Sequence, residues 1–231
     1  MKLKLINKQN EARGTVSFFW KPEKPLSWLP GQYYYYTLPK LNYPDPRGDT
    51  RHFTISSSPT EGKLLRLTTR IREESGYKKT LNELPIGSTV EGDGPTGTFI
   101  FDENEKTKSH IFLAGGIGIT PFRVFIKYSI DKNLKIPMHL IYSNSDSDFT
   151  FKEELSEWEK QNPNIKIDFI DSSKEGHLDE NLIRKLVPSN YLLSSTYWLV
   201  GPSLFINAIE EVLEKLKVSS DNVHSEKFTG Y

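Results

Sequence analysis

The hydrophobic pattern of this 231-residue chain changes once, near residue 102, and the change limits the folds that the chain can adopt. Before it, short runs with two-residue periodicity or β-rich composition are separated by Gly and Pro turns, which is typical of a small antiparallel barrel. One short helix fits from about Gly76 to Leu84. The six strands that we predict are 3–6, 15–20, 32–38, 51–57, 64–72 and 88–91.

After residue 109, apolar runs alternate with helical segments, as in a parallel sheet with crossover helices. Thr150 and Glu153 fit a capping box that opens a helix through Trp158, and another helix begins near Ser203. We therefore expect a six-stranded antiparallel β-barrel followed by a parallel-sheet α/β domain. The strands predicted for the second domain are 110–114, 138–142, 165–170 and 197–200.

A wholly polar stretch, Asp102–Ser109, separates the two patterns. Because 231 residues exceed the usual size of one hydrophobic core, two domains are expected. We place the barrel domain at 1–101, a linker at 102–109 and the α/β domain at 110–231. A long exposed hairpin over the polar stretch is the alternative.

Composition excludes several classes of protein. The chain has 30 Lys plus Arg, 30 Asp plus Glu and 36% hydrophobic residues, which disfavours a disordered chain or a general nucleic-acid binder. The longest mostly apolar stretch, 111–122, contains three glycines and is shorter than the roughly 20 residues of a membrane span. Residues 1–13 lack an apolar signal core, so we expect a cytoplasmic protein.

The inventory of potential ligand residues narrows the chemistry further. There is no cysteine, which excludes disulfides, catalytic thiols and thiolate-held iron–sulfur clusters in this chain. The five histidines are scattered without ligand or triad spacing, so no metal site is expected. Any redox chemistry must therefore use another cofactor.

The sharpest local motif is a glycine-rich turn, Ala114–Pro121, between an apolar strand and a helix. Glycines there let a pyrophosphate approach the backbone, and a helix N-terminus offers amide donors and a positive dipole end. A tight turn without a ligand is the alternative. Pro121 also stands where the ordinary dinucleotide fingerprint has its third glycine.

A second motif begins at Arg51 and continues through His52, Phe53 and Thr54. On a strand, Arg51 and Phe53 point to one face while His52 and Thr54 point to the other. The run thus offers a cation, an aromatic ring and a hydroxyl group. By itself it could be an ordinary strand that ends in a Ser/Pro turn.

Taken together, the two motifs resemble the ferredoxin-NADP reductase superfamily, flavin-dependent NAD(P)H reductases in which an antiparallel barrel precedes a nucleotide-binding α/β domain. The resemblance covers nearly the whole chain. It implies that Arg51 pairs with a flavin phosphate, that Phe53 packs near the isoalloxazine, and that Thr54 directs its hydroxyl group towards flavin N5. His52 belongs to the same motif and is included among the flavin-binding residues.

The same resemblance implies that the flavin pyrophosphate rests at the start of the short helix. The residues there are Gly76, Tyr77, Lys78 and Lys79, and a lysine stands where the family has serine. The lysines could neutralise phosphate or form a solvated basic surface. FAD is the expected flavin, with FMN the less favoured choice.

For the nicotinamide nucleotide, the family's Gly-x-Gly-x-x-Pro loop and its Cys-Gly-Pro motif have counterparts, with Val200 in place of the cysteine. The strand ending at Tyr142 is followed by serines and aspartates without Arg or Lys, which tilts the choice towards NADH but leaves NADPH open. The residues that the resemblance assigns to NAD(P) are Gly116, Ile117, Gly118, Thr120, Pro121, Ser143, Asn144, Gly201 and Pro202.

The chain ends in Glu-Lys-Phe-Thr-Gly-Tyr, which resembles the family's terminal Glu-x-aromatic motif. The resemblance implies that Phe228 covers the flavin face that the nicotinamide must reach, with Tyr231 a second candidate or a group that stacks on adenine. The catalytic residues expected from the resemblance are Thr54, Glu226 and Phe228.

These residues together imply hydride transfer from NADH or NADPH to FAD, followed by release of single electrons to a separate carrier. Residues 1–101 contain 15 Lys plus Arg against 10 Asp plus Glu, a net charge of +5, and residues 102–231 have a net charge of −5. A basic barrel would attract an acidic ferredoxin or flavodoxin. The alternative is a regulatory or electron-transfer subunit of a larger complex, which binds FAD without turning over NAD(P)H by itself.

Overall fold

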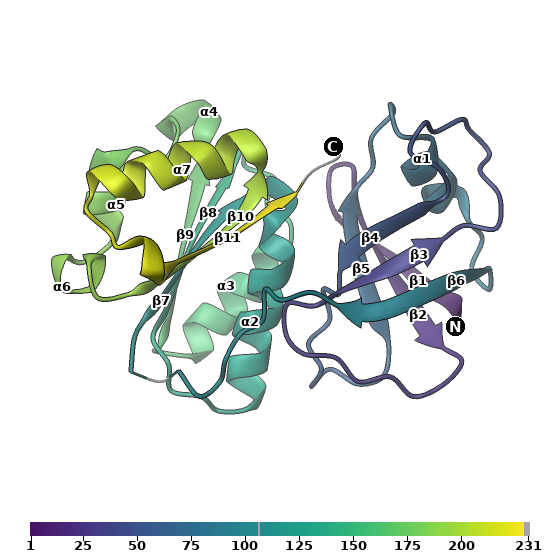
Figure 1. Cartoon of the computed structure of the whole chain (residues 1–231), viewed down its shortest axis with the longest axis horizontal. Helices are drawn as coiled ribbons and strands as arrows, with labels where there is room; N and C mark the ends of the chain where they lie inside the picture. The colour runs from purple at the N-terminus through teal and green to yellow at the C-terminus, as the bar shows by residue number, and fades with distance from the viewer. Residues whose placement is uncertain (106, 229–231) are drawn as a thin grey trace. The chain divides into compact units, whose positions relative to one another are not determined.

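The computed structural model describes residues 1–105 and 107–228, which form two compact units, Met1–Phe101 and Asp102–Tyr231 (Figure 1). The first unit is built on a six-stranded sheet and the second on a five-stranded sheet. The strands on either side of the polar stretch, β6 (Thr89–Thr96) and β7 (His110–Gly115), belong to different sheets, so they do not form a hairpin. The structure therefore rules out that alternative.

The first unit is the predicted antiparallel barrel, with strand order β4-β3-β6-β1-β2-β5. An antiparallel bridge between Ile55 and Leu67 connects the two edges of the sheet. The strands are β1 (Lys2–Ala12), β2 (Thr15–Pro22), β3 (Tyr33–Thr37), β4 (Thr50–Thr54), β5 (Leu65–Arg70) and β6 (Thr89–Thr96), and helix α1 (Gly76–Glu83) precedes β6.

Strand β3 contributes alternate tyrosine side chains to the barrel core. Tyr34 and Tyr36 are fully buried, whereas Tyr33 and Tyr35 on the other face are partly exposed. Tyr36 packs 5.7 Å from Trp20, and Tyr77 of α1 donates a hydrogen bond to the Tyr36 carbonyl (2.8 Å). The two-residue period of the sequence is therefore a true inside–outside alternation.

The second unit is the predicted parallel sheet, with order β11-β10-β7-β8-β9. Its strands are β7 (His110–Gly115), β8 (Met138–Asn144), β9 (Ile165–Asp171), β10 (Thr196–Pro202) and β11 (Val223–Phe228). The helical segments are η1 (Gly116–Gly118), α2 (Ile119–Asp131), α3 (Lys152–Gln161), α4 (Ser172–Glu175), α5 (Glu180–Leu186), α6 (Ser189–Leu192), α7 (Ser203–Lys215) and η2 (Ser220–Asn222).

Helices cover both faces of this sheet (Figure 1). Leu113 of β7 is buried in a cluster with Ile183 of α5 and Ile206 of α7. The preceding residue, Phe112, points to the opposite face of the sheet, where its ring stacks on that of Phe122 of α2 with 5.0 Å between the ring centres. Strand β7 is central: β8 and β9 follow on one side of it, and the chain then crosses to the other side to form β10 and β11. The order of the strands reverses at β7, and α/β sheets bind ligands at the carboxyl end of the strands at such a point.

One local prediction was wrong. Thr150 does not cap α3, which begins at Lys152 after Phe151 in a left-handed conformation (φ 65°) without a side-chain cap. The Phe151 ring is buried beneath the Arg123 guanidinium, 5.4 Å away. This packing fixes the start of the helix instead of the capping box.

Candidate nucleotide-binding sites

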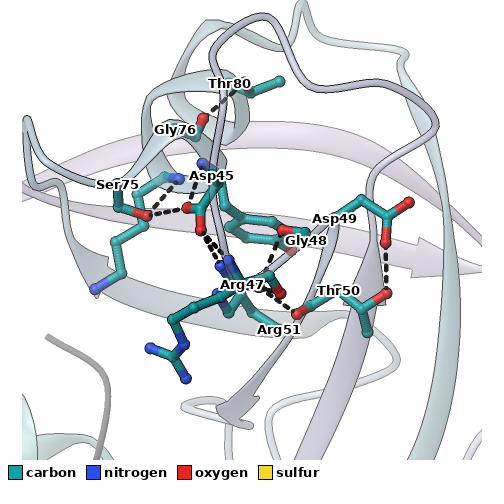
Figure 2. A network of polar contacts seen from close by, with 11 residues as sticks. Asp45, Arg47, Gly48, Asp49, Thr50, Arg51, Ser75, Gly76 and Thr80 are labelled. Atoms are coloured by element: carbon teal, nitrogen blue, oxygen red, sulfur yellow. Dashed lines mark hydrogen bonds and ion pairs between the residues drawn. The ribbon is translucent and has the colours of Figure 1, made fainter.

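Arg51, the residue expected to hold a flavin phosphate, lies on β4 and is held by the chain itself (Figure 2). Its guanidinium pairs with the Asp45 carboxylate at 2.6 Å. It also donates to the backbone carbonyls of Arg47 (2.7 Å), Gly48 (3.1 Å) and Thr50 (2.7 Å). Arg51 is therefore fixed in place by the loop that precedes its own strand.

Asp45 connects this loop to the start of α1. The Tyr77 amide and the Ser75 hydroxyl group each donate to Asp45 Oδ2 at 3.0 Å, and the Arg47 amide donates to Oδ1 at 3.0 Å. The side chain is only 4% exposed. Burial opposes its ionisation, but these hydrogen bonds and the Arg51 charge outweigh burial and lower the pKa of Asp45.

Packing explains why position 76 is a glycine, which the sequence alone did not show. A Cβ atom there would lie 2.3 Å from the Pro44 carbonyl oxygen and 2.5 Å from that of Tyr43. The absence of a side chain thus lets the loop backbone pack directly on the start of α1. Sequence reasoning missed Asp45 because Pro44-Asp45-Pro46 indicated only a turn.

The remaining residues of the first motif divide between two faces, as predicted. Phe53 packs 6.1 Å from the buried Tyr77 ring, and Arg51 lies 5.1 Å above the same ring. His52 is exposed on the opposite face, 4.8 Å from Tyr33. Thr54 ends β4, is 7% exposed and pairs across the ladder with Tyr33.

The two lysines of α1 differ in environment. Lys78 is 4% exposed, so it is not part of a solvated surface. Burial, followed by the charges of Arg72, Arg47 and Arg51, lowers the pKa of Lys78 to about 8. Lys79 is partly exposed and pairs with Glu73 at 3.2 Å. The start of α1 is therefore strongly positive, and its donors fit an anion; the anion that they hold in this structure is Asp45.

In the second unit, the glycine-rich turn runs from β7 through η1 into α2. Gly116 has φ +55°, and within 4 Å an added Cβ would meet only Asn144 Oδ1, at 4.0 Å. Gly118 has a helical backbone instead, with φ −61°. A Cβ there would lie 2.1 Å from the Val200 carbonyl oxygen. Position 118 is therefore a glycine because strand β10 approaches it closely, and not because a pyrophosphate does.

The start of α2 is suited to an anion. Its first turn contains no acidic residue, and Pro121 occupies that turn without a free N–H. Thr120 is buried, and its hydroxyl group donates to the Ile117 carbonyl (3.2 Å). The loop residues Gly116 and Ile117 are partly exposed. Amide donors and the helix dipole are therefore available at the end of β7.

The structure brings the other predicted nucleotide residues to the same edge of the sheet. Ser143 pairs with Gly115 across β8 and β7, which places Asn144 beside Gly116. On the other side, a Cβ at Gly201 would lie 3.2 Å from Gly115 Cα. Pro202 follows at the exposed end of β10. The three predicted segments thus meet at the carboxyl ends of β7, β8 and β10.

The charged residues near β8 are held within the protein. Asp146 Oδ1 accepts hydrogen bonds from Asn144 Nδ2 and the Asp148 amide, both at 3.0 Å. Arg123 is 2% exposed and forms a two-point ion pair with Glu154 at 2.7 and 2.9 Å. Its guanidinium also lies 5.3 Å from the Trp158 ring.

The C-terminal motif forms strand β11, where Glu226 pairs with Val200 and Phe228 with Pro202. Both side chains are half-buried. Glu226 Oε2 is buried and has no hydrogen-bond partner within residues 1–105 and 107–228. Burial raises the pKa of Glu226 to about 7. The other predicted aromatic residue, Tyr231, lies outside the described residues.

The described part of the chain has no helix with the length and hydrophobicity that a membrane span needs. It also contains no group of three His, Asp or Glu residues arranged to hold a metal ion.

Comparison with known proteins identifies a matching domain family and several relatives. Residues 112–211 match the oxidoreductase NAD-binding domain family. Flavohemoprotein A of Dictyostelium discoideum is 26% identical over 96% of this chain and 58% of its own length. The anthranilate 1,2-dioxygenase electron transfer component of Acinetobacter baylyi is 25% identical over 89% of this chain and 59% of its own length. The chain thus spans less than two thirds of these relatives.

A solved structure shows the same fold over the whole chain. The flavohem-like FAD/NAD-binding domain of nitric oxide dioxygenase from Vibrio cholerae has a TM-score of 0.82 and 20% identity, and 98% of each chain is covered. The fold, the matched domain family and these relatives agree with the ferredoxin-NADP reductase superfamily that the sequence resembles.

Proposed function

We propose that this chain takes a hydride from a nicotinamide nucleotide onto bound FAD and passes single electrons to a separate carrier. The observation that supports this most strongly is the meeting of Gly116, Asn144 and Gly201 at the carboxyl ends of β7, β8 and β10. FAD, when bound, supplies the centre that accepts two electrons together and releases them singly. The protein supplies binding and orientation.

Each predicted residue has a defined part in this proposal. Arg51 holds the flavin phosphate, and Thr54 offers its hydroxyl group to flavin N5. Thr120 orients the nicotinamide from the start of α2, and Phe228 moves aside to admit it. Glu226 holds a proton on its carboxyl group near neutral pH, because burial raises its pKa to about 7.

We infer that NADH is preferred over NADPH. A 2′-phosphate needs Arg or Lys beside the adenosine ribose, after β8. Arg123 is buried in its ion pair with Glu154, and Lys152 lies above the Phe149 ring at 5.6 Å. Asp146 is turned onto its own loop, so the missing cation, rather than repulsion by this aspartate, supports the preference.

The acceptor proposed is an acidic one-electron carrier such as a ferredoxin or flavodoxin. The first unit has a net charge of +5, which would increase the association rate of an acidic partner. The relative from Acinetobacter baylyi is named as an electron transfer component, which agrees with a role in supplying electrons to another protein.

A second candidate function is a subunit that does not turn over NAD(P)H. The ion pair between Arg51 and Asp45 favours it, since the expected flavin-phosphate ligand is already engaged. Such a regulatory or electron-transfer subunit of a larger complex would bind FAD without turning over NAD(P)H by itself.

The experiment that tests the proposal is an anaerobic visible spectrum of the protein reconstituted with FAD. Flavin absorbance near about 450 nm should disappear on a catalytic timescale with NADH and more slowly with NADPH. Thr54→Ala should slow the loss of absorbance, while Thr37→Ala, on the neighbouring strand β3, should leave the rate unchanged. Absorbance that persists with both nucleotides would favour the subunit, and failure to bind any flavin would refute the proposal.

A further inference from the structure

The loop between β3 and β4 is packed against the start of α1 by its backbone as well as by its charge. The Tyr43 and Pro44 carbonyl oxygens occupy the space that a side chain at position 76 would need, at 2.5 and 2.3 Å from its Cβ. The next residue, Asp45, then enters the first turn of α1 as a buried carboxylate. This closed arrangement depends on contacts between residues 30 and 32 positions apart in sequence.

The donors that hold Asp45 are those that an oxyanion of a phosphate would use. They are the guanidinium of Arg51 at 2.6 Å and the Tyr77 amide at 3.0 Å, with the Ser75 hydroxyl group beside them at 3.0 Å (Figure 2). A carboxylate and a phosphate cannot share the same N–H groups, because the two anions repel and each donor points in one direction.

We propose that Asp45 is an internal substitute for the flavin phosphate, and that FAD or FMN binds only after its phosphate displaces Asp45 from Arg51 and the start of α1. This inference rests on the proposed function, and it adds a residue that determines flavin affinity. The loop from Tyr43 to Arg51 is then closed before flavin binds and open afterwards.

The charges around α1 explain how a phosphate can displace the Asp45 carboxylate from Arg51 and the start of α1. Burial is the largest cause of the lowered pKa of Lys78, and the charges of Arg72, Arg47 and Arg51 add to it while Glu74 opposes it. These four basic side chains outnumber the two carboxylates, Asp45 and Glu74, so the cluster is positive. A phosphate with up to two negative charges gains more from that field than Asp45 does. Asp45, once released into water, recovers its hydration.

The closed loop should weaken binding of every flavin that has a phosphate. When only the open state binds, the apparent dissociation constant rises in inverse proportion to the open fraction. Asp45→Asn keeps an oxygen that the Arg47 amide can bind but removes the charge that pairs with Arg51. Asp45→Ala removes both interactions.

The experiment measures dissociation constants of FMN, FAD and riboflavin by quenching of flavin fluorescence. We expect Asp45→Asn to bind FMN and FAD at least about tenfold more tightly than the wild type, with riboflavin, which has no phosphate, changed less than about twofold. Asp49→Asn is the matched control. Asp49 lies in the same loop and accepts a hydrogen bond from Thr50 Oγ1 (3.0 Å), so this variant removes the same charge without touching Arg51.

Different results separate failure of this inference from failure of the proposed function. Equal or weaker FMN binding by a folded Asp45→Asn variant, or an equal gain for riboflavin or for Asp49→Asn, would overturn the displacement of Asp45 while leaving flavin binding intact. If neither the wild type nor any variant binds a flavin, both proposals fail. Thermal unfolding of each variant verifies that it is folded, and Asp45→Asn decides the matter if Asp45→Ala does not fold.

Discussion

Replacing Gly118 by alanine gives a prediction whose sign depends on the structure. Gly118 has φ −61° and ψ −4°, which alanine adopts easily, so the loss of backbone freedom in the unfolded chain would by itself stabilise the protein by up to about 1 kcal/mol. The added Cβ, however, would lie 2.1 Å from the Val200 carbonyl oxygen and 2.5 Å from its carbon. The clash must therefore be set against the gain.

The size of the clash follows from what stands in the way. Real Cβ atoms essentially never approach closer than 3.0 Å, so strand β10 or helix α2 must move by about 1 Å. β10 is paired with both β7 and β11 and cannot shift freely. Overpacking of this kind costs about 3 kcal/mol, which leaves a net loss of about 2 kcal/mol. With an m-value near 2 kcal/mol/M, the urea midpoint should fall by about 1 M.

The assay is urea unfolding followed by tryptophan fluorescence, with Gly116→Ala as the comparison. At Gly116 the space is open but φ is +55°, so alanine there should cost about 1 kcal/mol through backbone strain alone. If Gly118 served only to admit a pyrophosphate, Gly118→Ala would be as stable as the wild type or more stable, and only NADH binding would weaken. That result would refute the packing argument.

Three further predictions concern buried charges. Because the pKa of Glu226 is raised to about 7, the wild type should lose stability as the pH rises from about 4.5 through 7, and Glu226→Gln should remove this slope in urea unfolding at pH 5 and 8. Burial lowers the pKa of His110, whose Nδ1 accepts a hydrogen bond from the Trp198 indole (3.0 Å). Stability should therefore fall as the pH drops below 6.5, and His110→Asn should reduce this acid sensitivity as monitored by Trp198 fluorescence. Glu154→Ala removes the carboxylate that pairs with the buried Arg123 guanidinium and should cost about 3 kcal/mol, more than Arg123→Met, which leaves the more exposed Glu154 in contact with water; equal losses would contradict this.

The fold could be predicted because its signals are local. Alternation along Tyr33–Tyr36 and the apolar run of β7 each report burial within a few residues, and both were read correctly. Strand β1 is longer than its apolar part, since it continues to Ala12 through polar residues that pair with β2. That extension depends on a partner strand, which hydrophobicity does not reveal.

The sequence predicted which residues a nucleotide site would use, but it did not predict the packing that explains several of them. The glycines at 76 and 118 stand where the family motif requires them, yet each accommodates backbone from a distant segment. Phe151 shows the same effect, since contact with Arg123 from another helix overrides a capping box. Sequence patterns reflect interactions between residues that are close along the chain. These three positions are instead determined by contacts with residues that are distant in sequence.

The same distinction separates Asp45 from Asp146, because the two carboxylates accept hydrogen bonds from different kinds of donor. Both are aspartates in polar loops near an expected phosphate, so charge alone would treat them equally. Asp146 accepts hydrogen bonds from two donors of its own loop, Asn144 Nδ2 and the Asp148 amide. Asp45 instead takes the Tyr77 amide and Arg51, which are the expected phosphate donors. With Asp45 as the proposed substitute for the flavin phosphate, substitution of Asp45 should change flavin affinity without changing the affinity for NADH.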